Sequence, residues 1–232
     1  MVHEKEGYKF FCFSNVFPIK DMAERDILKL IIASPNNALV ASLKDTLQNF
    51  PAHGQAANIG EMSFEVLDVK SLDVKLTRRN LKVLTATPVI IRIPERNYDK
   101  YGIPEDERKQ RYVYWRPKYS FDAFLKQLSE NLIKKFNEFY GTNIENYDLF
   151  EQFMFRRPTA TKVVINGKEY VMVGSMWEFV WSYLDDMQLR VIEFGLDTGF
   201  GERSSLGFGF VNRVGERKGN LDERNIVSSR GH

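Results

Sequence analysis

The sequence is poor in residues that build disulfides and transition-metal sites: its 232 residues include one cysteine, Cys12, and three histidines, at positions 3, 53 and 232. A single cysteine excludes an internal disulfide and a cysteine-rich zinc site. The sequence also contains no stretch apolar and long enough to span a membrane, and no visible secretory signal. We therefore expect a cytoplasmic protein without a membrane partner.

The chain lacks a strong excess of charge of either sign, since 33 basic and 31 acidic side chains leave a formal net charge of +2. A nucleic-acid surface must therefore be a local patch rather than a field over the whole molecule. Apolar residues make up 43% of the sequence and include 18 phenylalanines, which is enough for a real core. The length allows one large domain or two small ones.

Residues 1–76 are predicted to form a strand, a strand, a helix and a strand. Leucines recur at helical spacing after Ser34, which is the expected N-cap. The predicted bounds are 8–17, 27–33, 35–50 and 62–75. A ferredoxin-like unit has the order βαββαβ, so this block matches its last four elements and lacks the first strand and helix.

Residues 77–214 form a second block of the same kind, with Asn166-Gly167 as a type I′ hairpin signal. Trp177, Phe179 and Trp181 share one face of a strand and are predicted to be core. The expected bounds are strands at 81–93 and 112–115, a helix at 121–139, strands at 148–157, 162–165, 169–173 and 175–183, a helix at 184–196 and a strand at 208–214. The predicted class is α+β, with two tandem ferredoxin-like halves, the first incomplete, and a polar tail at 215–232.

A glycine-rich stretch joins the last predicted helix to the last strand. Four glycines fall within its eleven residues, and three phosphate-capable donors lie at its tip. The glycines are Gly199, Gly201, Gly207 and Gly209, and the donors are Arg203, Ser204 and Ser205. Such a turn can form a concave set of N–H groups that binds an anion, or it can be a tight turn alone. It is not a Walker loop, because no Lys-Ser/Thr follows the glycines, and it lies after a helix rather than opening one.

A basic stretch precedes this turn and reads as a hairpin. Between positions 153 and 170 the net charge is +3, from Arg156, Arg157, Lys162 and Lys168 against one glutamate. Basic residues on an edge strand often only discourage aggregation. Beside an anion-binding turn they would form a groove for an RNA backbone.

The glycine-rich stretch resembles the C-terminal glycine-rich loop of the RAMP superfamily, with G-x-G, five residues and then G-F-G over residues 199–209. It is most similar to the archaeal-type endoribonucleases that process CRISPR repeat RNA. The resemblance implies binding and cleavage of repeat RNA to give guide RNAs, with no metal or organic cofactor. It also implies an N-terminus shorter than that of the relatives.

The segment from His3 to Lys9 resembles the family segment in which a catalytic histidine precedes a lysine by six residues. The resemblance assigns His3 and Lys9 to the scissile phosphate. Histidine can act as base or acid at neutral pH, and an ammonium group can stabilise the developing negative charge. The family tyrosine cannot be assigned here, because the helix that carries it is absent from the predicted elements.

Three alternatives remain open from the sequence. The chain is a nuclease, a non-cleaving RNA-binding relative or subunit of an RNA-guided effector complex, or an interaction scaffold without RNA affinity. A homodimer is a further expectation, because an edge left by the missing strand invites pairing.

Overall fold

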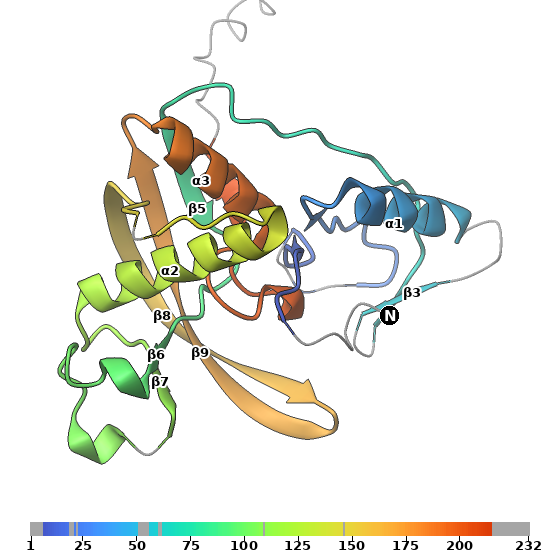
Figure 1. The fold of residues 1–232 in the computed structure, drawn as a ribbon. Helices are drawn as coiled ribbons and strands as arrows, with labels where there is room; N and C mark the ends of the chain where they lie inside the picture. Colours follow the sequence, from blue (N-terminus) through green and yellow to red (C-terminus); the bar gives the residue numbers. More distant parts are fainter. Residues whose placement is uncertain are drawn as a thin grey trace, which may run out of the picture.

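The computed structural model describes residues 7–18, 21, 23–50, 56–59, 62–108, 110–145 and 147–214 (Figure 1). His3 and the predicted tail at 215–232 lie outside these residues. The helices are α1 (Asn37–Asn49), α2 (Phe121–Tyr140) and α3 (Asp186–Thr198), with 3₁₀ helices η2 (Glu95–Asn97), η3 (Glu105–Glu107) and η4 (Ser204–Leu206). The strands are β1 (Cys12–Phe13), β2 (Ile32–Ala33), β3 (Ala57–Ile59), β4 (Met62–Phe64), β5 (Leu81–Thr85), β6 (Arg92–Pro94), β7 (Tyr112–Tyr114), β8 (Gln152–Ile165), β9 (Lys168–Trp181) and β10 (Val211–Arg213).

The largest sheet has four antiparallel strands in the order β10-β5-β9-β8. Along the chain its elements run β5, α2, β8, β9, α3, β10, with the two-stranded sheet β6-β7 inserted before α2. This is the βαββαβ order of a ferredoxin-like unit. The mixture of helices and antiparallel strands agrees with the predicted α+β class.

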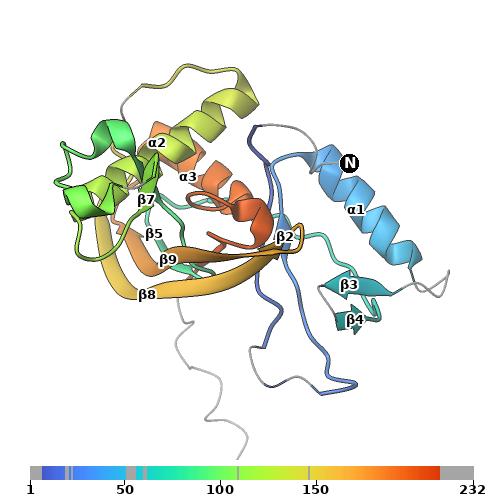
Figure 2. The same cartoon turned by 90° about the horizontal axis from the view of Figure 1, so that it is seen from below.

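Helices α2 and α3 cover one face of this sheet (Figures 1 and 2). Helix α2 begins where the Ser120 side chain accepts a hydrogen bond from Asp122 N, and ends at Gly141, whose φ of 65° is left-handed. Between these caps, Phe124 stacks on Trp177 with ring centroids 4.1 Å apart. Trp177, Phe179 and Trp181 are all buried, so their assignment to the core is confirmed.

The N-terminal block differs from the prediction in its strands. Only short pairs form, β1 with β2 and β3 with β4, and they do not join into one sheet. The N-cap of α1 is Asn36 rather than the predicted Ser34. Asn36 Oδ1 accepts a hydrogen bond from Leu39 N at 3.1 Å, whereas Ser34 Oγ donates to Phe10 O. No residue of α1 is fully buried, so this helix is weakly tied to the rest of the molecule.

The predicted hairpins at 148–183 merge into one long hairpin. Strands β8 and β9 are each 14 residues long, and their register shifts at a bulge between Phe155 and Arg157. Asn166 and Gly167 have φ values of 50° and 74°, which confirms the type I′ turn. Figure 1 shows the tip of this hairpin projecting beyond the helices.

Residues 65–80 connect the two blocks without a helix or strand, and Figure 1 shows them crossing between α1 and α3. The exposed part of this connection ends at Leu76, because the Leu76 side chain is buried and its N–H donates to Glu193 Oε1 at 3.0 Å. None of the helices in the described ranges is both long and apolar enough to cross a bilayer.

Candidate nucleic-acid interface

The glycine-rich loop, which we define as residues 199–210, connects α3 to β10 through η4. Gly201 and Gly209 show why the loop needs glycine. A Cβ atom at Gly201 would lie 2.6 Å from Ile90 O, and one at Gly209 would lie 2.0 Å from Phe200 O. Both residues also have positive φ, at 78° and 72°, where a side chain is strained. Gly201 therefore lets the loop pack closely against Ile90, and Gly209 lets the two ends of the loop approach each other.

Most of the loop's N–H groups point inward. Phe200 N donates to Gly209 O, Glu202 N to Ile90 O and Gly209 N to Pro88 O, at 2.8, 3.0 and 2.8 Å. Gly207 N and Phe208 N bond within the loop itself. These five groups are not available to an anion, so they do not build the concave anion site considered from the sequence.

The outer side of the loop carries the charged residue predicted at its tip. Arg203 is exposed and has a left-handed φ of 61°. Ser205 is half-buried, whereas Ser204 is only 6% exposed. Of the three predicted phosphate donors, Arg203 is therefore the one most open to a ligand.

The N-terminal segment at 7–14 runs beside the loop. A Cβ at Gly207 would lie 2.9 Å from the Phe13 ring, and one at Gly199 would lie 3.1 Å from Cys12 Cβ. Cys12 fills this contact: it is fully buried and its thiol faces the carbonyl groups at the end of α3. Burial raises the pKa of Cys12 to about 12, so the thiol stays protonated at neutral pH.

Lys9 lies on this segment between two aromatic residues. Phe10 packs against Phe139 of α2 at 5.0 Å between ring centroids. Burial raises the pKa of the Tyr8 phenol, and the charges of Glu138 and Glu202 raise it further. Since Glu202 belongs to the glycine-rich loop, Tyr8 lies close enough to that loop to sense its charge.

A buried cation lies under the loop. Lys135 of α2 is 2% exposed, and its Nζ donates to Gly199 O at 2.5 Å and Gly201 O at 3.2 Å. Burial lowers the pKa of Lys135 to about 8, against the opposing effects of Cys12 and Glu202. We did not single out this residue from the sequence. The available signal was a lysine interrupting the apolar face of α2, seven positions after Leu128.

Arg92 and Glu202 form a partly buried ion pair at the edge of the loop. The Arg92 backbone N–H also donates to Glu202 Oε1 at 3.2 Å, and the guanidinium lies 4.4 Å from the Tyr112 ring centroid. Burial raises the pKa of the nearby Tyr114 phenol, and the charges of Arg92 and Arg203 lower it. Arg203 therefore lies near a group of aromatic and cationic side chains.

The basic hairpin residues differ in their partners. Arg156 pairs with Glu178, which also pairs with Lys82 at 2.5 Å. Hydrogen bonds from these two cations hold the pKa of Glu178 below its usual value. Lys162 pairs with Glu169 at 3.0 Å in an exposed contact.

Arg157 and Lys168 are exposed. The hairpin thus presents Arg157 and Lys168 on its surface, whereas Arg156 is engaged with Glu178.

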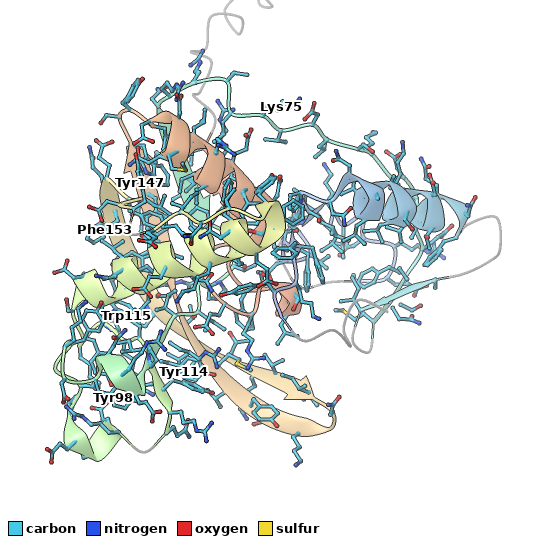
Figure 3. All side chains as sticks on the ribbon, in the orientation of Figure 1. Lys75, Tyr98, Tyr114, Trp115, Tyr147 and Phe153 are labelled. Carbon is cyan, nitrogen blue, oxygen red and sulfur yellow. The ribbon has the colours of Figure 1, made fainter. Side chains whose placement is uncertain are left out.

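The hairpin and the glycine-rich loop meet in a small apolar cluster of Ile90, Met172 and Phe208. Tyr114 packs against it, and its hydroxyl donates to Met172 Sδ at 3.3 Å. Figure 3 shows Tyr114 beside the hairpin. The structure therefore joins the two segments that the sequence assigned to RNA, although 30 or more residues separate them.

The predicted site residues are only partly gathered. The glycine-rich loop contacts both the hairpin and the segment with Lys9, whereas His3 lies outside the described residues. In the part of the chain that the structure describes, no group of three or more His, Cys, Asp or Glu side chains is arranged to hold a metal ion.

Comparison with known proteins identifies the family. The C-terminal family of the CRISPR associated protein Cas6 matches residues 68–213. The CRISPR-associated endoribonuclease Cas6 of Haloferax mediterranei is 32% identical over 214 residues, which cover 89% of this chain and 77% of the relative. The CRISPR-associated endoribonuclease Cas6 2 of Methanocaldococcus jannaschii is 26% identical over 224 residues, covering 92% and 84%.

A solved structure of a CRISPR associated protein Cas6 shares the fold, with a TM-score of 0.63 at 24% identity over 92% of this chain and 82% of that chain. The resemblance found in the glycine-rich stretch is thereby confirmed. This chain belongs to the Cas6 family of CRISPR-associated endoribonucleases.

Proposed function

We propose that this endoribonuclease binds CRISPR repeat RNA and cleaves it by attack of a 2′-hydroxyl on the adjacent phosphate, to generate guide RNAs. The new O2′–P bond replaces the P–O5′ bond, which leaves a 2′,3′-cyclic phosphate and a 5′-hydroxyl. The reaction needs a base for the 2′-hydroxyl proton, an acid for the leaving 5′ oxygen and positive charge beside the phosphorus. No metal takes part in this proposal.

One observation supports a reaction site at the N-terminal segment. This segment, which includes Lys9, runs beside the glycine-rich loop, with Phe13 against Gly207 and Cys12 against Gly199. An RNA strand lying on the loop would then pass close to the start of that segment. In this reading Lys9 stabilises the charge on the phosphate, and His3 exchanges protons with the two ribose oxygens.

Arg203 and the hairpin would hold the RNA backbone. A guanidinium group binds phosphate with charge-assisted hydrogen bonds, and Arg203 is the exposed donor of the loop. Arg156, Arg157, Lys162 and Lys168 would extend this contact along β8 and β9, while Gly199, Gly201, Gly207 and Gly209 give the loop its shape. Ser204 and Ser205 would add hydroxyl donors.

The test uses end-labelled CRISPR repeat RNA in EDTA. The wild-type chain should make one cut, with a cyclic phosphate on the upstream fragment. Lys9→Ala should slow single-turnover cleavage by about a hundredfold, the usual loss when one donor to a developing oxyanion is removed. His3→Ala should abolish the cut, and Lys29→Ala serves as a control for the loss of one exposed positive charge.

A repeat RNA with a 2′-deoxy sugar at the scissile position separates the mechanisms. It should bind normally and remain intact, and cleavage of this substrate would exclude the 2′-hydroxyl as nucleophile. Tight binding of ordinary repeat RNA without any cut would instead support a non-cleaving relative.

The remaining expectations belong to the same proposal. The N-terminal block would form the first of two ferredoxin-like halves, and the protein would act in the cytoplasm. Pairing with a second copy, or association with an RNA-guided effector complex, would use surfaces other than the glycine-rich loop.

A further inference from the structure

Lys135 is a buried charge without a role in the chemistry above. Both of its hydrogen bonds go to main-chain carbonyl groups of the glycine-rich loop rather than to a carboxylate, among the residues that the structure describes. Helix α2 is long and well packed, so it offers a fixed point from which a side chain can reach the inner side of the loop.

Both carbonyl groups belong to glycines, whose peptide groups can turn at little energetic cost. Gly199 and Gly201 have φ values of 80° and 78°, and glycine has more backbone conformations available than any other residue. A buried carbonyl without a donor is costly, so loss of the Lys135 amine would favour a loop in which both peptide groups turn.

We propose that Lys135 is a positioning residue that holds the glycine-rich loop in its RNA-binding conformation from the inner side. This inference rests on the proposed function, because it assumes that the outer side of the loop faces RNA. Lys135 itself does not touch the RNA, since the loop lies between them.

The lysine also has a chemical advantage over a purely apolar residue. An ammonium group and a neutral amine both donate N–H groups, so the two contacts to the loop survive loss of the proton. The groups that face Lys135 are the Cys12 thiol from β1 and the Glu202 carboxylate from the loop, and Asp197 at the end of α3 lies by Cys12. Lys135 can therefore hold the loop whether its side chain is charged or neutral.

The test compares Lys135→Met with Lys134→Met. Lys134 neighbours Lys135 on α2, but its side chain is 55% exposed and pairs with Glu130 at 3.5 Å. Each variant loses one positive charge from the same turn of the same helix, so a difference between them reports the buried contacts. Lys135→Gln is added because its amide keeps a donor of shorter reach.

Two quantities are measured: affinity for uncleaved repeat RNA, and hydrogen exchange of individual amides. Lys135→Met should bind RNA about tenfold more weakly than wild type, the loss expected for hydrogen bonds from a charged donor. The amides of Phe200, Glu202 and Gly209 should exchange faster, while that of Trp177, bonded to Thr85 Oγ1 in the sheet, should be unchanged. Lys134→Met should match wild type, and Lys135→Gln should fall between the two.

Several outcomes would overturn the proposal. One is wild-type loop exchange and RNA affinity in Lys135→Met. A second is an equal increase in the exchange rates of loop and sheet amides. A third is failure of both Lys135 variants to fold. In either case Lys135 would stabilise the whole domain rather than position the loop. If wild type does not bind repeat RNA, the proposed function fails, and loop exchange alone still decides whether Lys135 positions the loop.

Discussion

Single residues at this interface are constrained by packing as much as by ligand chemistry. A Cβ atom at Gly201 or Gly209 would meet a backbone oxygen at a distance that real Cβ atoms do not show. Most loop N–H groups are bonded within the protein. The sequence pattern of glycines therefore specifies how the loop packs, and Arg203 at its tip stays exposed.

Gly209→Ala should lower the free energy of unfolding by more than about 2 kcal/mol, because it combines a strained φ with a backbone clash. Gly141→Ala is the matched control: φ is 65°, but nothing lies within 4 Å of its added Cβ. It should cost only about 1–2 kcal/mol, the penalty of the left-handed conformation. Urea denaturation of both variants measures the difference, and equal losses would show that the contact with Phe200 O is not limiting.

Lys135 should make stability rise with pH on the alkaline side. Its pKa is about 8 in the folded chain, whereas the pKa of a lysine in the unfolded chain is about 10.4. Between these values the unfolded chain binds more protons, so the free energy of unfolding increases with pH. Relative to Lys135→Met, wild type should gain about 1.4 kcal/mol per pH unit across this window. Urea titrations at pH 7.5, 9 and 10 measure it, and a flat or falling difference would contradict the lowered pKa.

At the scale of elements, the long hairpin is the structure's main departure from the predicted strands. Its inner half belongs to the four-stranded sheet, while its outer half projects beyond the helices (Figure 1). Val164 and Tyr170 near the tip are 69% and 45% exposed. We expect this exposed pair of strands, which carries Lys162 and Lys168 near its tip, to be suited to following a nucleic-acid backbone.

The hairpin lysines should act through charge alone. Replacing Lys162 and Lys168 together by alanine should weaken RNA binding and reduce the slope of log affinity against log salt by about 1.4, or about 0.7 per lost phosphate contact. Stability should change little, because Lys168 is exposed and the Lys162–Glu169 pair is a surface contact.

Glu169→Gln is the control for the broken surface pair, and it should leave the salt slope near that of wild type. An unchanged slope in the double variant, measured by fluorescence anisotropy over a salt series, would remove the hairpin tip from the interface.

At the scale of the whole molecule, the core is concentrated in the C-terminal block. The buried aromatic residues of the main core come from the elements after residue 80, and α1 buries no residue fully. Leu67, Leu72 and Val74 of the connection are 66%, 69% and 57% exposed. The two blocks are therefore joined by a segment with few stabilising contacts.

Limited trypsin digestion should reflect this arrangement. Cleavage at Lys70 or Lys75 should precede every cut within residues 81–213, because extended, exposed backbone fits a protease more readily than a paired strand or helix. Mass spectrometry of the early fragments identifies the order. A first cut inside 81–213 would contradict a boundary near residue 76.

Local sequence patterns were sufficient to predict the elements whose structure depends mainly on their own residues. The sequence predicted a helix at 121–139, which is α2 in the structure; Asn166-Gly167 predicted the turn, and the alternation of Trp177, Phe179 and Trp181 predicted a buried strand face. The short strands of the N-terminal block were overestimated, because apolar runs there find no continuous partner in the described residues. His3, Lys9 and the RNA-binding residues stay predictions.

The sequence by itself determined the family, through the spacing of the four glycines at 199–209. Only the tertiary structure decided what surrounds the glycine-rich loop: Lys135 beneath it, Arg92 paired with Glu202 beside it, and Met172 of the hairpin packed on Phe208. These contacts join residues 36 to 110 positions apart. Periodicity and turn chemistry describe neighbours along the chain, whereas such contacts depend on how α2, β6 and β9 pack together.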